Sequence, residues 1–457
     1  MLKDAWTVAI ETLSWMEMQK LSEHMALERT VKQLAVKDPN AIRYGYGMVV
    51  EVTRQRNLID KFVNVTVSPK KIGDYNLGIQ SFLRLYVYQT RAVKSWGKVN
   101  LKEAEQMAAM GRSILGWQTM REIEQFLGFL LTQQLEPILA TADEVERISL
   151  ETFHPSWFVK YCFNLLGHND ALAFLRGSIN PPPNYVRINT LMATEEAIVQ
   201  KLGEEGVKLE KEPQLNYTYK VTEAKRPLNL LVSHKEGLFC IQDKASCFAT
   251  QAADPKVDTV VFDVCAAPGA KTTYIAQLMK NSGAIYSIDY SSRRLEAWKK
   301  ETARMHTSIA QPLIADACAT LPLNGNADLI VLDPPCTGIG IFAKQPSAKW
   351  RLRPKSIEKM AEIQWQMINR CGEKVAPGGA LIYSTCSITL EENEAIVGRF
   401  LKEHEEFSLA EIEPKIGLPG LQGLTQCQRL YPHIHRCNGF FIAKLRKEQA
   451  FLPKLPI

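Results

Sequence analysis

Two short segments hold the residues best suited to chemistry. Asp333-Pro334-Pro335-Cys336 and Ser384-Thr385-Cys386 each place a cysteine just after a short apolar run that predicts a buried strand, and the two cysteines are 50 residues apart. A turn between an expected strand and an expected helix, residues 263–272, precedes both segments and contains a glycine. Two thiols beside a turn of the nucleotide-binding kind indicate covalent chemistry on a ring that does not react unaided.

A pyrimidine such as cytosine is a ring of this kind. Its carbon 5 is too weak a nucleophile to attack a methyl sulfonium, but a thiolate that adds to carbon 6 makes carbon 5 enamine-like. A base must then remove the carbon-5 proton before the thiol can leave. Asp333 could hold the amide edge of the base, because the two prolines after it fix an extended turn.

The attacking thiol needs a neighbour that lowers its pKa, since a free cysteine is only a few per cent thiolate at pH 7. Lys271, at the expected helix start, is the best candidate cation. The residues alone leave open whether Cys336 or Cys386 attacks. The other isolated cysteines are expected to be small buried hydrophobic residues: Cys162, Cys240, Cys247, Cys318 and Cys371.

The turn at residues 263–272 predicts a cofactor site. Gly269 and its alanine neighbours allow a ligand to approach the backbone, and the helix that follows directs free N–H groups to the same place. Asp289 ends the next expected strand and suits two ribose hydroxyls, and Asp316, after the third, could accept from an adenine amino group. The alternative is that Asp263, Asp289 and Asp316 only cap strand ends.

The sequence of the same turn excludes two common kinds of nucleotide-binding site. It lacks both the Gly-x-Gly-x-x-Gly dinucleotide pattern and the phosphate-binding Gly-x-x-x-x-Gly-Lys pattern. A nucleoside cofactor without a pyrophosphate fits better, and S-adenosylmethionine is the leading choice.

Composition sets the broad class of protein. The chain has 457 residues, a net charge of +6 and ten cysteines with no Cys-x-x-Cys pair, which predicts reduced thiols. The charge permits a polyanionic partner without requiring one. We expect no membrane span, no metal site, a cytoplasmic location and a monomer. His433, His435 and Cys437 are the nearest approach to metal-ligand spacing, but a fourth ligand is missing.

Periodicity divides the chain into three predicted domains. Residues 1–150 are expected to be helical, with residues 79–88 as a core helix. Residues 151–254 are expected to form a linker helix, ended at Gly167, and a small α+β module with a strand at 185–191 and a helix at 195–206. Residues 255–457 alternate strand and helix, which predicts a Rossmann-like doubly wound α/β domain.

The α/β domain has six expected strands and four expected helices. The strands are Thr259–Val264, Ala284–Ile288, Pro312–Ala315, Asp328–Leu332, Ala380–Tyr383 and Gly439–Leu445. The helices are Lys271–Lys280, Ser292–Met305, Pro354–Val375 and Leu390–Glu403. Pro377-Gly378-Gly379 is expected to be a turn into the fifth strand.

Several of these motifs together resemble the Sun/Fmu family of S-adenosylmethionine-dependent RNA cytosine carbon-5 methyltransferases. The resemblance covers about residues 150–445. It rests on the 263–272 turn and on these segments: Asp333-Pro334-Pro335-Cys336-Thr337-Gly338, Tyr383-Ser384-Thr385-Cys386-Ser387, Arg187-Ile188-Asn189-Thr190-Leu191, Gln242-Asp243-Lys244-Ala245-Ser246 and Gly439-Phe440-Phe441-Ile442-Ala443.

The resemblance ranks the two cysteines and implies the site residues. It implies that Cys386 attacks carbon 6 and that Cys336 assists product release, whereas DNA cytosine methyltransferases attack from the Pro-Cys motif. Asp333 and Lys271 complete the implied catalytic set. The implied cofactor set is Cys265, Ala266, Ala267, Pro268, Gly269, Ala270, Lys271, Asp289, Arg294, Asp316 and Asp333. Many relatives have glycine where this chain has Ala270.

RNA is the expected partner. Cations around Trp350 suit phosphate contact and base stacking, although a solvated loop is the alternative: Lys344, Lys349, Arg351, Arg353 and Lys355. Arg187 and Asn189 could also contact RNA or be local caps. Residues 1–150 resemble the helical RNA-binding domain of the antitermination factor NusB through Leu83-Arg84-Leu85 and Tyr88-Gln89, which favours ribosomal over transfer RNA. A second hypothesis is a non-catalytic RNA-binding factor, and a third is a DNA or small-molecule methyltransferase.

Overall fold

The computed structural model describes residues 1–97 and 99–449. The chain folds into two compact units that do not follow simple sequence order. The helical unit consists of Met1–Asn180 together with Phe342–Leu352, and the sheet unit of Pro181–Ile341 together with the residues from Arg353 onward. The three-domain division at residues 150 and 254 stays a prediction.

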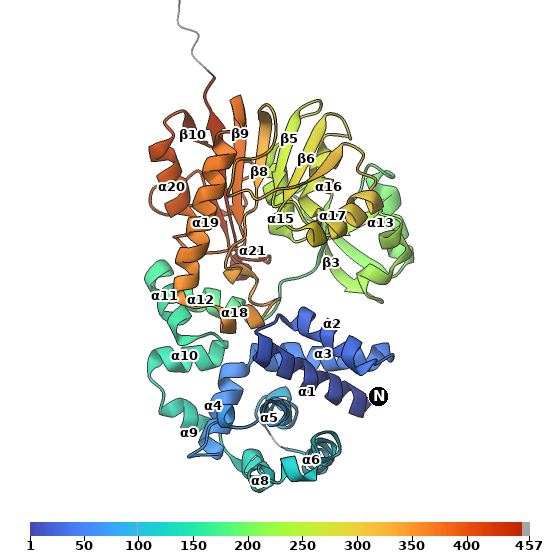
Figure 1. The fold of residues 1–457 in the computed structure, drawn as a ribbon, viewed down its shortest axis with the longest axis vertical. Helices are drawn as coiled ribbons and strands as arrows, with labels where there is room; N and C mark the ends of the chain where they lie inside the picture. The colour runs from blue at the N-terminus through green and yellow to red at the C-terminus, as the bar shows by residue number, and fades with distance from the viewer. Residues whose placement is uncertain (98, 450–457) are drawn as a thin grey trace, which may run out of the picture. The chain divides into compact units, whose positions relative to one another are not determined.

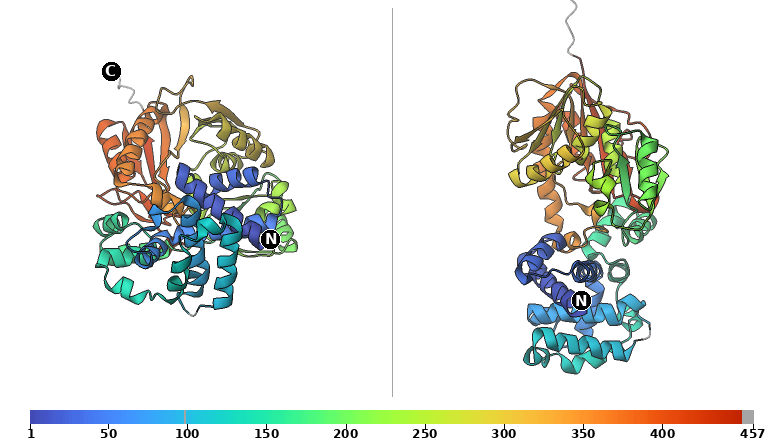
Figure 2. Two further views of the ribbon diagram at one scale, coloured as in Figure 1. Left: turned by 60° about the horizontal axis from the view of Figure 1, so that its bottom comes forward. Right: turned by 90° about the vertical axis from the view of Figure 1, so that its right-hand side faces the viewer.

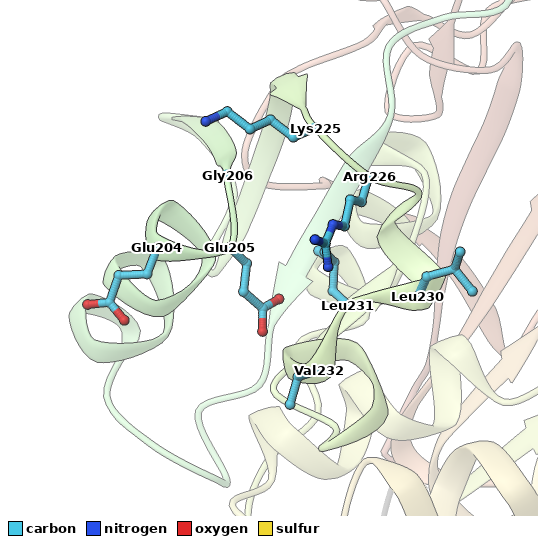
Figure 3. Close-up of a pocket in the computed structure, with 8 residues that line it drawn as sticks. All are labelled: Glu204, Glu205, Gly206, Lys225, Arg226, Leu230, Leu231 and Val232. Carbon is cyan, nitrogen blue, oxygen red and sulfur yellow. The ribbon is translucent and has the colours of Figure 1, made fainter.

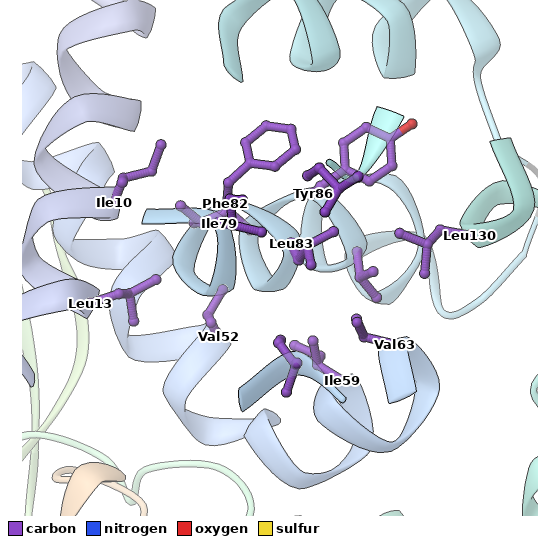
Figure 4. Close-up of a cluster of buried hydrophobic side chains, with 14 of the residues drawn as sticks. Ile10, Leu13, Val52, Ile59, Val63, Ile79, Phe82, Leu83, Tyr86 and Leu130 are labelled. Atoms are coloured by element: carbon purple, nitrogen blue, oxygen red, sulfur yellow. The ribbon is translucent and has the colours of Figure 1, made fainter. Parts of the chain in front are cut away.

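The helical unit is built around α5, as the blue and cyan helices in Figures 1 and 2 and the close-up in Figure 4 show. Helix α5 begins where the Asn76 side chain accepts a hydrogen bond from the Ile79 N–H (3.0 Å). Its Ile79, Phe82, Leu83 and Tyr86 are buried among side chains of neighbouring helices. The helices are α1 (Leu2–Gln19), α2 (Glu23–Leu34), α3 (Pro39–Arg54), α4 (Arg56–Thr66), α5 (Leu77–Thr90), α6 (Leu101–Leu115), α7 (Trp117–Met120), α8 (Glu124–Thr132), α9 (Glu136–Ala140), α10 (Glu144–Thr152), α11 (Ser156–Leu166), α12 (His168–Gly177) and α18 (Ser347–Arg351).

Arg84 of α5 is a buried cation within this core. Its guanidinium donates to both carboxylate oxygens of Asp60, at 2.7 and 2.9 Å, and to Glu17 at 3.2 Å. A buried guanidinium is stable only when such acceptors satisfy it. Through these bonds Arg84 fixes helices α1, α4 and α5 to one another. The helices of this unit confirm the helical character expected for residues 1–150.

The Phe342–Leu352 segment packs inside the helical unit although it lies late in the chain. Lys349 is 1% exposed and donates from Nζ to the Phe153 carbonyl oxygen at 2.6 Å. The Trp350 indole N–H donates to the Thr53 carbonyl oxygen at 2.6 Å. The prediction that Lys349 and Trp350 are part of an exposed RNA-binding cluster is therefore wrong, because both polar groups are used in packing.

The first part of the sheet unit is a small α+β module. Four antiparallel strands pair in the order β2-β3-β1-β4. Along the chain, α13 follows β1, α14 follows β3, and α15 follows β4. Val186, Ile188 and Phe239 of the sheet pack against Ile198 and Leu202 of α13. The elements are β1 (Tyr185–Ile188), α13 (Glu195–Glu204), β2 (Val207–Lys211), β3 (Thr218–Ala224), α14 (Val232–Lys235), β4 (Phe239–Ile241) and α15 (Lys244–Ala253).

The larger sheet has the expected doubly wound form. Its strand order is β11-β12-β13-β9-β8-β5-β6-β7, in which β9, β8, β5, β6 and β7 run parallel and β13 is antiparallel to β9. The elements are β5 (Val260–Val264), α16 (Ala270–Leu278), β6 (Ala284–Asp289), α17 (Ser292–Arg304), β7 (Ala310–Ile314), β8 (Ala327–Leu332), α19 (Pro354–Gly372), β9 (Val375–Thr385), α20 (Glu394–Glu403), β10 (Phe407–Ala410), β11 (Leu418–Pro419), β12 (Gln428–Leu430), α21 (Pro432–His435) and β13 (Phe440–Lys447).

Helices cover both faces of this sheet, as the upper part of Figure 1 shows. On one face, Phe262 and Leu332 pack with side chains of α19 and α20. On the other, Val261 and Val331 pack with side chains of α15 and α16. Neighbouring residues of one strand thus face opposite helix layers, which is why these strands are apolar on both sides and not alternating.

Each of the six strands and four helices expected in the α/β domain is present, with shifted ends. The turn expected at residues 377–379 is wrong, because β9 runs continuously from Val375 to Thr385. Gly378 has a φ of 80°, and the pairing of β9 with β8 shifts register near this point. The glycines thus produce an irregularity in the strand pairing inside β9, and they do not mark the beginning of the strand. None of the helices in the described ranges is long and apolar enough to cross a membrane.

Candidate active site

The predicted site residues gather where the sheet reverses its winding direction. After β5 the chain adds β6 and β7 on one side and then returns to add β8 on the other side of β5. The carboxyl ends of β5 and β8 therefore border a switch point, the place where open α/β sheets bind ligands. Cys265 follows β5, and Asp333 follows β8.

The turn after β5 has the backbone that its sequence predicts. Gly269, with a φ of 110°, directly precedes α16, and a Cβ atom at this position would lie 3.1 Å from Trp298. Only glycine tolerates this conformation without strain. The first N–H groups of α16 have no carbonyl partner within the helix, so they are free to meet a ligand.

Asp263 lies under this turn and is buried. Its carboxylate accepts from the Thr272 hydroxyl, which also accepts from the Trp298 indole N–H at 2.9 Å. Burial raises the pKa of Asp263 to about 6, although Thr272 and Lys271 act in the opposite direction. These bonds tie β5, α16 and α17 together behind the cofactor turn.

Asp289 and Arg294, both predicted cofactor residues, pair with each other. The Asp289 side chain is 0% exposed and lies 3.1 Å from Arg294 Nη1, while the Ala267 N–H donates to it at 3.3 Å. Arg294 also donates from Nη2 to the Ala267 carbonyl oxygen at 2.6 Å. The guanidinium, 44% exposed, thus covers the carboxylate.

Asp316, another predicted cofactor residue, lies in an exposed position. It follows β7, its side chain is exposed, and one of its oxygens accepts from the Cys318 N–H at 2.9 Å. That bond holds the local turn and leaves the carboxylate capacity for further donors.

Lys271 and Asp333 form an ion pair, with 2.5 Å between Nζ and a carboxylate oxygen. Burial alone would lower the pKa of Lys271, but the Asp333 carboxylate and other nearby anions outweigh it and raise that pKa. Cys386 is among the anionic groups that act on Lys271 when it is a thiolate. The lysine is therefore charged and within electrostatic reach of Cys386, as its sequence position predicts.

The two cysteines are in contact, with 3.1 Å between their sulfur atoms. Both are partly buried. The contact with Cys386, burial and the nearby Glu392 carboxylate raise the pKa of Cys336 well above its ordinary value. At neutral pH Cys336 therefore keeps its proton. Cys318, expected to be buried, is only partly so, whereas the other four isolated cysteines are buried as expected.

Glu392 is the site residue that sequence analysis missed. It is 0% exposed and accepts hydrogen bonds from both cysteine loops, through Thr337 and Ser387. Glu392 was expected to lie within the helix Leu390–Glu403, but α20 begins only at Glu394, so Glu392 belongs to the loop before it. The available signal was an acid embedded among hydroxyl residues six positions after Cys386.

Arg187 and Asn189 are not available for RNA contact. Arg187 is 0% exposed and donates to Gln242 at 2.9 Å, to Thr273 at 2.7 Å and to Gln277. Asn189 donates to the carbonyl oxygens of Gly237 and Met305 at 2.9 and 3.0 Å. The prediction of RNA contact is wrong for both, because each joins the small α+β module to the larger sheet domain.

A cavity of about 330 Å³ lies apart from these residues, in the small α+β module (Figure 3). It is lined by Glu204, Glu205, Gly206, Lys225, Arg226, Leu230, Leu231 and Val232. Glu205 accepts from the Ser233 N–H at 3.0 Å and so supports the start of α14. None of the predicted site residues lines this cavity. Among the described residues, no group of three or more metal-ligating side chains is present.

Comparisons with known proteins agree with this arrangement. A family model described as 16S rRNA methyltransferase RsmB/F matches residues 250–446, and an RsmF/B-like ferredoxin-like domain matches residues 154–225. The probable ribosomal RNA small subunit methyltransferase B of Bacillus subtilis is 28% identical over 96% of this chain and 98% of its own length.

Two solved structures are also similar. The crystal structure of PH0851 matches with a TM-score of 0.82 and 28% identity, over 98% of this chain and 99% of that one. NSun6 from Pyrococcus horikoshii, solved with the S-adenosylmethionine analogue SFG, matches with a TM-score of 0.60 and 28% identity, over 64% of this chain and 98% of that one. These matches identify the chain as an S-adenosylmethionine-dependent RNA cytosine carbon-5 methyltransferase, in which residues 154–225 and 250–446 match the models of the RsmB/F, or Sun/Fmu, family.

Proposed function

We propose that this enzyme methylates carbon 5 of a cytosine in ribosomal RNA through a covalent bond between Cys386 and carbon 6, and that Cys336 assists release. The observation that carries the proposal is the contact of the two thiols, 3.1 Å apart, with Cys386 within electrostatic reach of Lys271. Covalent catalysis of this type needs one attacking sulfur and one group that helps it leave.

S-adenosylmethionine is proposed to bind around the turn after β5. S-adenosylmethionine supplies a methyl group on a sulfonium sulfur when it is bound. The Gly269 cradle and the free N–H groups of α16 fit its amino-acid portion. Asp289 is proposed to meet the ribose hydroxyls after Arg294 swings aside, and Asp316 the adenine amino group. The remaining members of the set line the turn: Cys265, Ala266, Ala267, Pro268, Ala270, Lys271 and Asp333.

The proposed reaction has three steps. The Cys386 thiolate forms a bond to carbon 6, and the electron pair of the carbon 5–carbon 6 double bond moves to make carbon 5 nucleophilic. Bound S-adenosylmethionine would supply the methyl group for carbon 5, and the bond between that methyl group and the sulfonium sulfur would be the one that breaks. A base removes the carbon-5 proton, the double bond re-forms, and Cys386 leaves as a thiolate.

The different surroundings of the two thiols support this division of roles. Cys336 keeps its proton because its pKa is raised, so it is a poor nucleophile in the resting enzyme. Cys386 is instead the thiol whose negative charge, when it forms, acts on the buried Lys271 side chain. Asp333, held at 2.5 Å by Lys271, lies at the end of β8, where it is proposed to accept from the cytosine amide edge.

Ribosomal RNA is the proposed target on two grounds. The Bacillus subtilis relative is named as a ribosomal RNA enzyme. The helical unit is the proposed RNA-binding counterpart of NusB, with Arg84 buried as a structural residue and not as an RNA contact. A monomer in the cytoplasm is proposed.

The test uses labelled S-adenosylmethionine and separated ribosomal and transfer RNA. Cys386→Ala is expected to abolish transfer, and Cys336→Ala to accumulate an RNA–protein adduct that survives denaturation. Full transfer by Cys386→Ala would refute the covalent role. Labelling of transfer RNA alone would change the proposed substrate from ribosomal to transfer RNA. Labelling of neither RNA would favour the hypothesis of a non-catalytic RNA-binding factor.

A further inference from the structure

Glu392 is a buried carboxylate with no role in the reaction described above. It is 0% exposed, and its partners in the described chain are all uncharged. An ionised carboxylate is costly to bury unless several hydrogen bonds satisfy it. Such an arrangement, bonded to the residues that directly follow the two cysteines, indicates a purpose beyond packing.

The donors to Glu392 come from both cysteine loops. On the Pro-Cys side, Thr337 donates from its N–H at 2.8 Å and from its hydroxyl at 2.5 Å. On the Thr-Cys side, the hydroxyls of Ser387 and Thr389 donate at 2.6 and 2.8 Å. Thr337 follows Cys336 and Ser387 follows Cys386, so one carboxylate holds the residue after each cysteine.

A fifth donor fixes this network to the sheet and its covering helix. The Gln364 side-chain amide of α19 donates to Glu392 at 3.0 Å and to the Pro335 carbonyl oxygen at 2.9 Å. The Tyr383 hydroxyl of β9 donates to the Glu392 carbonyl oxygen at 2.6 Å. The loops therefore cannot shift relative to each other without breaking bonds to a group that water does not reach.

We propose that Glu392 is the positioning residue of the two-thiol site: by bonding Thr337 and Ser387 at once, it sets the distance between the Cys336 and Cys386 sulfurs. The inference rests on the proposed roles of the two cysteines. Glu392 does not touch the cytosine or the cofactor and acts only through the loops that carry the thiols.

The negative charge of Glu392 has a second consequence. It lies close enough to contribute to the raised pKa of Cys336, after the larger contributions of Cys386 and burial. Removing that charge lowers the pKa of Cys336, so the thiol reacts at lower pH.

The test is designed to keep geometry and activity separate. Phenylarsine oxide binds tightly only where two thiols can reach one arsenic atom, so its capture reports the spacing of the sulfurs without any RNA. Wild type is expected to bind one equivalent at this site, and Cys336→Ser to lose it. Glu392→Gln is expected to capture the probe more slowly while it binds S-adenosylmethionine with unchanged affinity.

Activity and thiol titration complete the test. Glu392→Gln is expected to lower kcat about 10- to 100-fold with unchanged KM for RNA, because misplacement of about 1 Å costs this much. In a Cys386→Ser background, Glu392→Gln is expected to move iodoacetamide labelling of Cys336 to lower pH. Glu403→Gln, at the exposed far end of α20, is the matched control and should match wild type.

Two further variants cover the case in which Glu392→Gln does not fold. Thr337→Val and Ser387→Ala remove single donors and leave the carboxylate, so each should slow arsenical capture and turnover by a smaller factor. Wild-type capture and kcat in all three variants would overturn the proposal. If the wild-type enzyme binds one equivalent of phenylarsine oxide but methylates no RNA, the proposed function is refuted. The positioning role of Glu392 is not refuted by that result.

Discussion

Glu392 and Glu394 are two residues apart and equally buried, yet their surroundings differ in kind. Glu394 forms a two-pronged ion pair with Arg429, with both N–O distances at 2.6 Å. Glu392 has only neutral donors, which belong to the cysteine loops and to α19. One carboxylate is paired with a cation, and the other is bonded only to uncharged groups of the loops that carry the thiols.

The difference shows how a fold can separate stability from reactivity. The Glu394–Arg429 pair joins α20 to β12, and its two charges act in opposite directions on the pKa of the neighbouring Cys427. A cation placed beside Glu392 would instead cancel the field at Cys336. The absence of a cation among its described partners is consistent with a role in the chemistry of the thiols.

The largest expected effect comes from breaking the neutralised pair. Arg429→Met leaves Glu394 buried without its cation and is expected to lower the free energy of unfolding by about 3–5 kcal/mol. The double variant Arg429→Met/Glu394→Met should recover much of this loss. Urea unfolding measures both. Equal stability of the single and double variants would show that the pair is not coupled.

Lys349 extends the comparison to a buried amine whose side chain is bonded to a carbonyl oxygen and not to a carboxylate. Burial lowers its pKa to about 7, and Arg54 acts in the same direction, whereas Glu51 and Glu23 oppose the shift. Between pH 7 and about 10.5 the unfolded chain binds a proton that the folded chain does not, so stability rises with pH there. One group contributes at most about 1.4 kcal/mol per pH unit.

Thermal unfolding from pH 7 to pH 9 checks this expectation. Lys349→Met should lose most of the rise that wild type shows and should be at least as stable at pH 7. A Lys344→Met variant provides the control, since Lys344 is exposed in the same segment. An identical pH slope in wild type and Lys349→Met would contradict the assignment of a neutral buried amine.

The smallest effect is expected where the cation is exposed. Arg294 pairs with Asp289 but is 44% exposed, so Arg294→Ala should change the free energy of unfolding by less than about 1 kcal/mol. Asp289→Asn should instead weaken binding of S-adenosylmethionine, measured by calorimetry, by more than Arg294→Ala does. The reverse order would assign the ribose contact to Arg294.

Sequence patterns predicted the α/β domain well because its strands are apolar runs with turn residues at their ends. The ends of the strands also place Lys271, Asp333 and both cysteines together by topology alone. The bend expected at Pro377 was wrong, because Gly378 could be accommodated as an irregularity inside a paired strand.

Side chains whose roles depend on distant partners could not be predicted in the same way. Arg187 and Lys349 carry charge, which usually indicates exposure, but both are buried by contacts with elements remote in the chain. Glu392 was missed for the same reason. Two of its donors, at positions 387 and 389, are local, but the donors at positions 337 and 364 are remote and become neighbours only in the fold.

The Phe342–Leu352 segment has a practical consequence for dividing the protein. A fragment that starts at Pro181 retains this segment but lacks the helices that satisfy Lys349 and Trp350. A fragment that ends at Asn180 keeps the Phe153 and Thr53 carbonyl groups without their donors. A division at residue 180 therefore separates groups that are bonded in the folded chain, so we expect the two halves to be recovered together when they are co-expressed.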